Sequence, residues 1–199
     1  MKTLKEFLKK HNACKEGFDF AKDLTLEEFL ETCERGDWIL WLFEKTNSSD
    51  SLKYTALVAG HCANTVRHLM QDERSIKAVD VTIAFGEGRA TIEELNDVAT
   101  YAAIAAYAAS YVAASWTVDA VDAVDANAYT AAAHAAWAAA YAAYAVCGAA
   151  DYNAAADAAC NAAANAAANA AAAKKENQKL ITDICRKYLP LEIWDQSKI

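Results

Sequence analysis

Histidine and cysteine side chains are the first candidates for chemistry in this chain, because they are common ligands of zinc. The first half of the sequence holds His11, Cys14, Cys33, His61, Cys62 and His68. On one helix, His61 and His68 would lie two turns, about 10 Å, apart, too far to hold one ion together, and His61 and Cys62 would point to different faces. Only His11 and Cys14 have a usable local spacing, and one such pair does not make a site. We therefore predict no bound metal and no cofactor.

A cysteine beside a histidine could also form a nucleophilic pair, with His134 as the base for Cys62, Cys147 or Cys160. Such a pair also needs an oxyanion-binding loop and a third residue that orients the histidine. The sequence has no recognisable motif for either. His134 falls in an apolar seam of a predicted helix, which favours a hydrogen-bonded core histidine. We predict that the protein is not an enzyme.

Three aspartates form the remaining group with functional potential. Asp119, Asp122 and Asp125 follow one another at a spacing of three residues, which places them along one edge of a helix. They could accept Lys or Arg from a partner, where ion pairs favour specificity and fast association more than raw affinity. They could also be a solvated helix start, in which the helix dipole stabilises Asp119 and Asp122 by about 0.3 to 1 kcal/mol each. Both interpretations stay open.

The charge is distributed very unevenly along the chain. The net charge of the 199 residues is −8, and residues 90–173 hold eight acidic residues, no Lys or Arg, and alanine at about every second position. The rest of the chain is balanced, with all 19 basic residues and the other 19 of the 27 acidic ones. An acidic protein disfavours nucleic acid and anionic lipid and attracts basic proteins. We predict a basic protein partner and no binding of nucleic acid.

Neither a membrane nor an export route is indicated. The uncharged stretches 98–118 and 126–150 are long enough to cross a bilayer of about 30 Å, but alanine gives little insertion energy and no Lys or Arg flanks them. Residues 1–6 alternate charged and apolar side chains, unlike a signal peptide. The cysteines lack CxxC spacing, which fits buried thiols in a reducing compartment. We predict a cytoplasmic protein with no membrane span.

The chain carries signals for helices almost throughout, since it has one proline, six glycines and no sustained strand alternation. Thr25 and Glu28 form a capping box that predicts a helix start. Gly36 predicts a break, after which Asp37 caps an apolar segment. For residues 1–89 we predict short helices at 4–10, 25–35, 38–43, 52–70 and 72–85.

The alanine-rich part, residues 90–199, begins at a second capping box formed by Thr91 and Glu94. A single helix from there to Leu189 would be about 150 Å long, far longer than a small domain, so the chain must fold back. Breaks at 115–117 and 147–150 predict three long antiparallel helices at 92–114, 118–146 and 151–188. The whole chain, 1–199, is thus predicted to be a single all-α domain, a multi-helix bundle of short helices packed with three long ones.

Large side chains recur along the predicted long helices at heptad-like spacing. They are Tyr101, Ile104, Tyr107 and Tyr111 on the first helix, and Thr130, His134, Trp137, Tyr141 and Tyr144 on the second. Close packing of alanine faces could leave an aromatic pocket between them. We name Tyr101, Trp137 and Tyr141 as its candidate lining.

Four segments together resemble a family of immunity proteins associated with bacterial polymorphic toxin systems, and the resemblance spans most of the chain. The segments are Ala13-Cys14-Lys15-Glu16-Gly17, residues 33–42 (CERGDWILWL), residues 72–79 (DERSIKAV) and Gly88-Arg89-Ala90-Thr91, followed by the alanine-rich tail. The Arg-Gly-Asp-Trp stretch is the most specific, and Ser75 stands where the family pattern suggests proline. The resemblance implies an intracellular, all-helical, non-enzymatic protein that neutralises a toxin by binding it.

These observations lead to one expected function and one alternative. We expect an immunity-like protein that binds a basic toxin or effector through Asp119, Asp122 and Asp125 or near Asp37 and Trp38. Asp37 and Trp38 also fit a helix cap and a core anchor. The alternative is a phage or mobile-element anti-defence protein that sequesters a small-molecule or nucleotide signal. Exposed alanine faces could also pair between chains, so a homodimer is compatible with the sequence.

Overall fold

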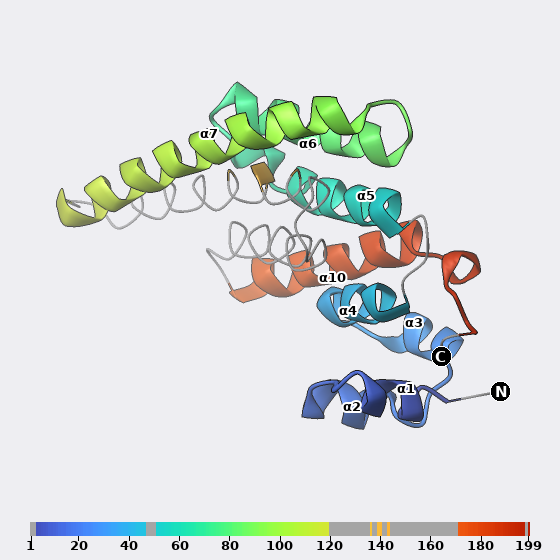
Figure 1. Cartoon of the computed structure of the whole chain (residues 1–199). Helices are drawn as coiled ribbons and strands as arrows, with labels where there is room; N and C mark the ends of the chain where they lie inside the picture. Colours follow the sequence, from blue (N-terminus) through green and yellow to red (C-terminus); the bar gives the residue numbers. More distant parts are fainter. Residues whose placement is uncertain are drawn as a thin grey trace.

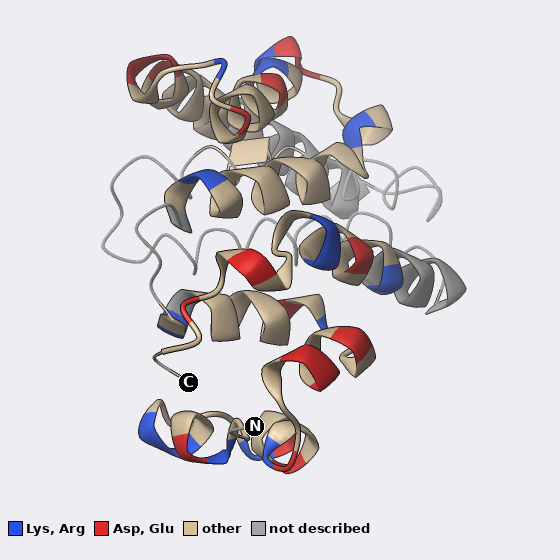
Figure 2. Ribbon diagram, turned by 90° about the vertical axis from the view of Figure 1, so that its right-hand side faces the viewer, with Lys and Arg blue, Asp and Glu red and all other residues tan. Residues whose placement is uncertain are grey.

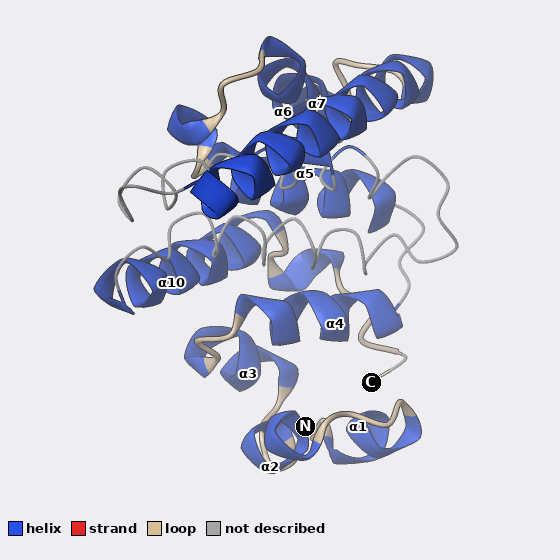
Figure 3. Ribbon diagram, turned by 90° about the vertical axis from the view of Figure 1, so that its left-hand side faces the viewer, coloured by secondary structure: helices blue, strands red, loops and turns tan. Residues whose placement is uncertain are grey.

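The protein is all-α in the part that the computed structural model describes, which comprises residues 3–46, 51–119, 171–197 and 199 and four alanines between 136 and 143. The α-helices are α1 (Lys5–Lys10), α2 (Lys15–Ala21), α3 (Leu26–Thr32), α4 (Gly36–Thr46), α5 (Ser51–Asn64), α6 (Glu73–Gly86), α7 (Ile92–Asp119) and α10 (Ala171–Tyr188). Two short 3₁₀ helices, η1 (Arg67–Leu69) and η2 (Leu191–Ile193), follow α5 and α10. No strand occurs among these residues (Figure 3). The predicted fold class is therefore confirmed at this level.

The helices are stacked in layers from one end of the molecule to the other (Figure 1). α6 and α7 lie at one end and pack on each other, α5 packs against α6, and α10 contacts both α5 and α4. α3 follows, and α1 and α2 form the opposite end. The helix closest to the C-terminus therefore lies between segments from the first third of the sequence. The antiparallel packing of three long helices falls largely outside the described residues.

Both capping boxes predicted from the sequence are present in the structure. The Thr25 hydroxyl accepts a hydrogen bond from the Glu28 backbone N–H at 3.2 Å, and the Glu28 carboxylate accepts one from the Thr25 N–H at 2.8 Å. Thr91 and Glu94 make the same reciprocal pair at the start of α7. Each box satisfies two backbone donors that the first helical turn leaves free.

Three predicted helix boundaries in the first half are wrong. α3 ends at Thr32 instead of Arg35, and α4 begins at Gly36, so the break falls at residues 33–35 and Gly36 is helical. α5 ends at Asn64 instead of continuing to Met70. A local pattern locates such ends poorly, because tertiary contacts decide which backbone groups find partners.

The predicted break at 115–117 is also wrong, since α7 runs without interruption from Ile92 to Asp119. Ser, Trp and Thr each cost only a few tenths of a kcal/mol relative to alanine in a helix, and neither Gly nor Pro is present to stop it. Asp119 is consequently the last described residue of α7, far from the start of that helix at Ile92. The helix-start interpretation, with its favourable dipole, does not apply to Asp119, while Asp122 and Asp125 lie outside the described residues.

α5 and α6 pack at unusually close range through reciprocal glycines. A Cβ placed on Gly60 of α5 would lie 2.7 Å from Ile83 Cγ1 of α6, and one on Gly86 of α6 would lie 2.6 Å from Leu57 Cγ of α5. Gly88, which ends this segment, has φ +76°, a backbone conformation that other residues adopt only with strain. Gly60 and Gly86 therefore fix the distance between α5 and α6.

α5 divides the core into two clusters. One face, which includes Ala56, Ala59 and Ala63, packs with α6, α7 and the buried alanines 136, 139, 140 and 143. The other face contributes Val58 and Cys62 to a cluster with α1 to α4, α10 and the C-terminal turn. The first cluster is built largely from methyl groups, each contributing about 0.8 kcal/mol, whereas the second contains large aliphatic and aromatic side chains.

α7 turns its small residues toward this core. Ala99, Ala102 and Ala106 are buried, whereas Tyr101 is 57% and Ile104 49% exposed. The predicted aromatic seam is therefore not buried at these two positions, because close packing against α6 favours the alanine face. Among the helices that the structure describes, none is both long enough and apolar enough to cross a membrane.

Candidate functional site

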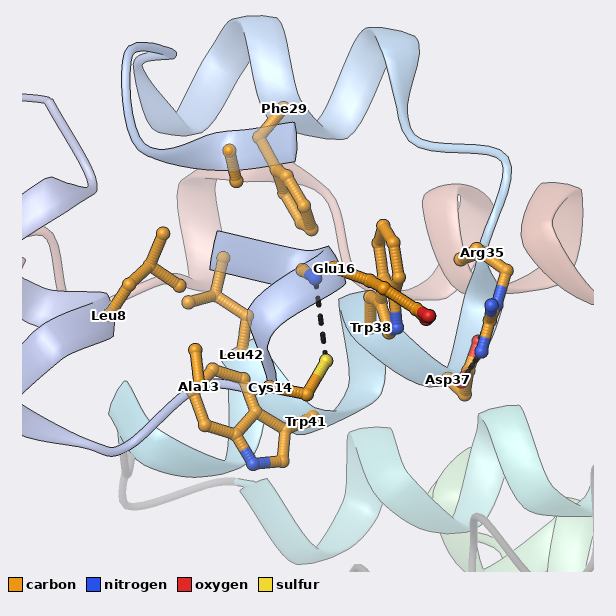
Figure 4. A pocket seen from close by; sticks show the side chains of 12 residues that line it. Leu8, Ala13, Cys14, Glu16, Phe29, Arg35, Asp37, Trp38, Trp41 and Leu42 are labelled. Carbon is orange, nitrogen blue, oxygen red and sulfur yellow. Dashed lines mark hydrogen bonds and ion pairs between the residues drawn. The ribbon is translucent and has the colours of Figure 1, made fainter. Parts of the chain in front are cut away.

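A pocket opens among α1, α2, α3 and α4, and we call it the Trp38 pocket. Its cavity volume is about 280 Å³. It is lined by Leu8, Ala13, Cys14, Glu16, Gly17, Ala21, Phe29, Arg35, Asp37, Trp38, Trp41 and Leu42. Figure 4 shows Leu8 at one end and the Arg35 and Asp37 side chains together at the other. The pocket thus has an apolar interior and a charged rim.

Arg35, Asp37 and Trp38 form a compact unit at this rim. Arg35 Nε donates to Asp37 Oδ1 at 2.8 Å, and one terminal nitrogen of the guanidinium donates to Oδ2 at 2.6 Å. The guanidinium carbon lies 4.7 Å from the centroid of the Trp38 ring, so the cation also stacks on the aromatic face. Asp37 lies in the first turn of α4, and its carboxylate binds the Arg35 side chain. The prediction that Asp37 caps this helix is wrong, because α4 already begins at Gly36 and Asp37 lies inside it.

Trp38 is fixed by packing from two other elements. Its ring lies beside Gly17 of α2, where an added Cβ would be 3.8 Å from two of the ring carbons. Phe20 of α2 approaches the ring at 5.7 Å between centroids and is itself 40% exposed. Trp38 is only half-buried and faces the pocket, so its predicted role as a core anchor holds only in part.

The loop that carries Arg35 is held by α10, a helix about 150 residues away in sequence. The Arg186 side chain donates to the carbonyl oxygens of Leu30 at 2.7 Å, Glu31 at 3.0 Å and Cys33 at 2.8 Å. The Thr182 hydroxyl donates to the Glu34 carbonyl at 3.0 Å. These bonds satisfy carbonyls that the end of α3 would otherwise leave without partners. They also explain why α3 ends before Arg35.

Gly36 allows this close approach. A Cβ at this position would lie 2.8 Å from Ile181 Cγ2 of α10, which is closer than real Cβ atoms come. Gly36 therefore serves the contact with α10 and does not break a helix. Each residue of the Arg-Gly-Asp-Trp stretch thus has a structural role. Arg35 supplies the cation of the rim, Gly36 allows the close contact with α10, and Asp37 and Trp38 lie at the pocket rim.

Acidic groups predominate at the charged rim. Glu16 and Asp37 carry two carboxylates against the single guanidinium of Arg35. The pKa of Arg35 is raised, chiefly by its hydrogen bonds to Asp37, and further by the charges of Asp37 and Glu16. Figure 2 shows acidic segments along the nearby α3 and mixed charges on α1 and α2. This end of the molecule thus favours a cationic ligand.

Cys14 is the only thiol on the pocket wall among the described residues, and its role there is structural. It is exposed, and its sulfur accepts a hydrogen bond from the Gly17 N–H at 3.3 Å as the N-cap of α2 (Figure 4). The expectation of uniformly buried thiols is wrong for Cys14. Cys33 is buried, and burial raises the pKa of its thiol to about 11, which keeps it protonated and poorly nucleophilic near neutral pH.

The structure places the sequence-derived site residues at separate locations. Asp37 and Trp38 lie together at the Trp38 pocket. Tyr101 lies on α7 with its ring exposed, and it does not line that pocket. Trp137 and Tyr141, like Asp122, Asp125 and His134, lie outside the described residues. Within the described ranges, no three His, Cys, Asp or Glu side chains are arranged to hold a metal ion.

Several residues of the site were not singled out from the sequence. Trp41 and Glu16 line the pocket, Phe20 flanks it, and Arg186 fixes its loop. The first two belong to segments that carry the family resemblance, which was the available signal. Nothing in the local sequence indicates that Arg186 binds α3.

Comparisons with known proteins give no relative for this chain. No protein-family model matches it, and no similar protein is found among curated proteins or among solved structures. The resemblance to immunity proteins therefore stays a prediction, and the function rests on the geometry of the site.

Proposed function

We propose that this protein is a non-enzymatic, immunity-like binding protein that neutralises a basic toxin or effector by direct contact, and that the Trp38 pocket is its anchor point. The supporting observation is the pocket itself, in which an apolar cavity of about 280 Å³ meets a rim of Trp38, Arg35 and Asp37. Trp and Arg are enriched among the residues that dominate the energy of protein interfaces, especially beside pockets that a partner side chain can fill.

The surroundings of the pocket support a protein partner over a small anionic ligand. The exposed Phe20 extends the aromatic surface beyond Trp38. Arg35, the only basic residue in the described lining, is engaged by Asp37, which disfavours phosphate. A nucleotide-like signal, as in the alternative function, would need free cations at the site. The acidic rim and the net charge of −8 instead favour a basic protein.

The test compares proteins captured by the wild type with those captured by two variants. Tagged wild type, Trp38→Ala and Tyr101→Ala are used as baits in a lysate of the source cells. Tyr101→Ala is the matched control, because it removes an exposed aromatic ring away from the pocket. We expect one basic protein to be retained by the wild type and Tyr101→Ala and lost with Trp38→Ala, after circular dichroism has shown that all three baits are folded.

The captured protein is then expressed alone in a bacterial host. We expect it to arrest growth, and co-expression of the wild-type binder, but not of Trp38→Ala, to restore growth. Capture that is insensitive to Trp38→Ala, or a captured protein without toxicity, would overturn the proposal.

The same complex tests the electrostatic part of the proposal. Binding of a basic partner should weaken as salt is raised from about 0.05 to 0.5 M, because screening shortens the range of charge attraction. Replacing Asp119, Asp122 and Asp125 together by Asn should weaken it further, whereas Asp80→Asn, which removes an exposed carboxylate on α6 that does not line the Trp38 pocket, should not. Affinity that ignores salt and the triple change would exclude the acidic helix edge from the interface.

A further inference from the structure

The Trp38 pocket already contains the chemical group that it is suited to bind. The guanidinium of Arg35 makes two parallel hydrogen bonds to Asp37, at 2.8 and 2.6 Å, and stacks on Trp38 at 4.7 Å. A planar fork on a carboxylate and a flat cation on an aromatic ring are the two interactions by which proteins distinguish arginine from lysine. The rim is thus a guanidinium site that a residue of the same chain occupies.

Arg35 can leave this site without disturbing the fold. Its side chain is 47% exposed and that of Asp37 34% exposed, and an ion pair in such a setting shifts an equilibrium by less than about fivefold. The backbone on its N-terminal side is fixed through the bonds of Arg186 and Thr182 to residues 30–34. Trp38 is held by Gly17 and Phe20 independently of Arg35. Rotation of one side chain would therefore free both the carboxylate and the ring face.

The charge and shape of the site specify what would replace it. Glu16 adds a second carboxylate to the rim, and its charge contributes to the raised pKa of Arg35. Behind the rim, Leu8, Phe29 and Leu42 line an apolar interior that suits an alkyl stem or an adjoining apolar residue. A carboxylate ligand would face two like charges there, and an uncharged ligand would leave Asp37 without its partner.

We infer that the protein partner inserts an arginine side chain into the Trp38 pocket, and that Arg35 is a placeholder that this arginine displaces. The inference rests on the proposed function and names the partner group that the pocket recognises. It also gives the Arg-Gly-Asp-Trp stretch one function: Asp37 and Trp38 form the site, and Arg35 closes it in the absence of the partner. The placeholder keeps the ring face and the carboxylate satisfied until binding.

The test uses N-acetyl-L-arginine amide as the probe on the full chain. Binding is followed through the indole N–H signal of Trp38 in ¹H–¹⁵N spectra, assigned by its loss in Trp38→Phe. We expect a saturable shift in the wild type, about 3- to 5-fold tighter binding in Arg35→Ala, and at least about 10-fold weaker binding in Asp37→Asn. N-acetyl-L-lysine amide should bind more weakly than the arginine probe to every variant that binds.

Matched controls come from a second exposed pair of the same geometry. Arg67 donates two hydrogen bonds to the two carboxylate oxygens of Asp80, away from the pocket. Arg67→Ala and Asp80→Asn therefore change the net charge by the same amounts and should leave probe binding within about twofold of the wild type. An Arg35→Ala effect equal to that of Arg67→Ala would be only a general charge effect and would overturn the placeholder.

The remaining outcomes are also decisive. Weaker binding in Arg35→Ala would make Arg35 a direct contact of the ligand, and equal binding of lysine and arginine would make the rim a simple cation site; either result overturns the inference. So does the lack of a saturable shift in both the wild type and Arg35→Ala. If the probe fails while the captured partner still depends on Trp38, only this inference falls. If the probe binds but no toxic partner depends on Trp38, the proposed function falls.

Discussion

At the scale of single residues, His61 is the histidine whose surroundings are most clearly defined. Its ring stacks on Tyr188 of α10 at 4.4 Å between centroids, and its Nε2 is buried without a hydrogen-bond partner among the described residues. Burial, and secondarily the charge of Lys187, lower the pKa of His61 below 6.5, while Glu87 opposes the shift. The zinc set considered from the sequence thus contains a histidine that serves the packing of α5 on α10.

The lowered pKa predicts a pH dependence of stability. Because the unfolded chain binds a proton at His61 more readily than the folded one, the free energy of unfolding should be fully maintained above about pH 6.5 and fall as the pH drops through the folded pKa. His61→Phe keeps a ring for stacking and removes the titration, so it should flatten this slope in urea unfolding between pH 7.5 and 5. The same change at the exposed His68 is the control. Equal slopes for wild type and His61→Phe would contradict the assignment.

At the scale of elements, the connection between α10 and the end of α3 organises the site. One side chain, Arg186, bonds three carbonyl oxygens on a segment 153 to 156 residues earlier. Hydrogen bonds from a charged donor contribute more than neutral ones, and carbonyls that lose such a donor at a partly buried helix end carry a desolvation cost. α10 therefore stabilises the second core cluster, formed with α1 to α4 and called the lower cluster below, and sets the position of the pocket rim.

Replacing Arg186 should destabilise the fold and loosen the pocket. We expect Arg186→Ala to lower the free energy of unfolding by about 2 to 3 kcal/mol, with Arg186→Lys recovering little, because an ammonium cannot reach three carbonyls at once. Lys179→Ala, at an exposed position of the same helix, should stay within about 0.5 kcal/mol of the wild type. Urea unfolding measures both effects. A loss for Arg186→Ala as small as that for Lys179→Ala would mean that water replaces the guanidinium without cost.

At the scale of the whole molecule, α5 joins two cores of different composition. Its alanine face belongs to the first cluster, formed with α6 and α7 and called the upper cluster, and Val58 and Cys62 belong to the lower one. The lower cluster extends to the C-terminal turn, where Trp194 is buried against Phe43 at 5.1 Å between ring centroids and donates to the Leu189 carbonyl at 3.0 Å. A helix shared by two clusters couples their unfolding, because neither keeps its packing when α5 is lost.

This coupling predicts that the chain unfolds as the single domain expected from its sequence. The chain also contains Trp116 and Trp137, so both are first replaced by Phe. In that background, tryptophan fluorescence reports on Trp38, Trp41 and Trp194 of the lower cluster, and helical circular dichroism reports on both clusters; the two signals should give coincident urea transitions. Gly60→Ala, which forces α5 away from Ile83, should shift both transitions equally, by about 1 to 3 kcal/mol. Lys53→Ala on the exposed side of α5 is the control. Two separated transitions would divide the chain into two units.

The sequence by itself determined the all-α class, the capping boxes at Thr25 and Thr91, and the end of the last helix before Pro190, because these depend on interactions within a few residues. It also marked Asp37 and Trp38 as a pair of interest. Only the tertiary structure decided that α3 stops at Thr32, that Gly36 begins a helix, and that Arg35, Asp37 and Trp38 share one pocket rim. Those outcomes depend on Arg186, Ile181, Gly17 and Phe20, which come from other helices, and contacts between distant segments leave no periodic signal in the local sequence.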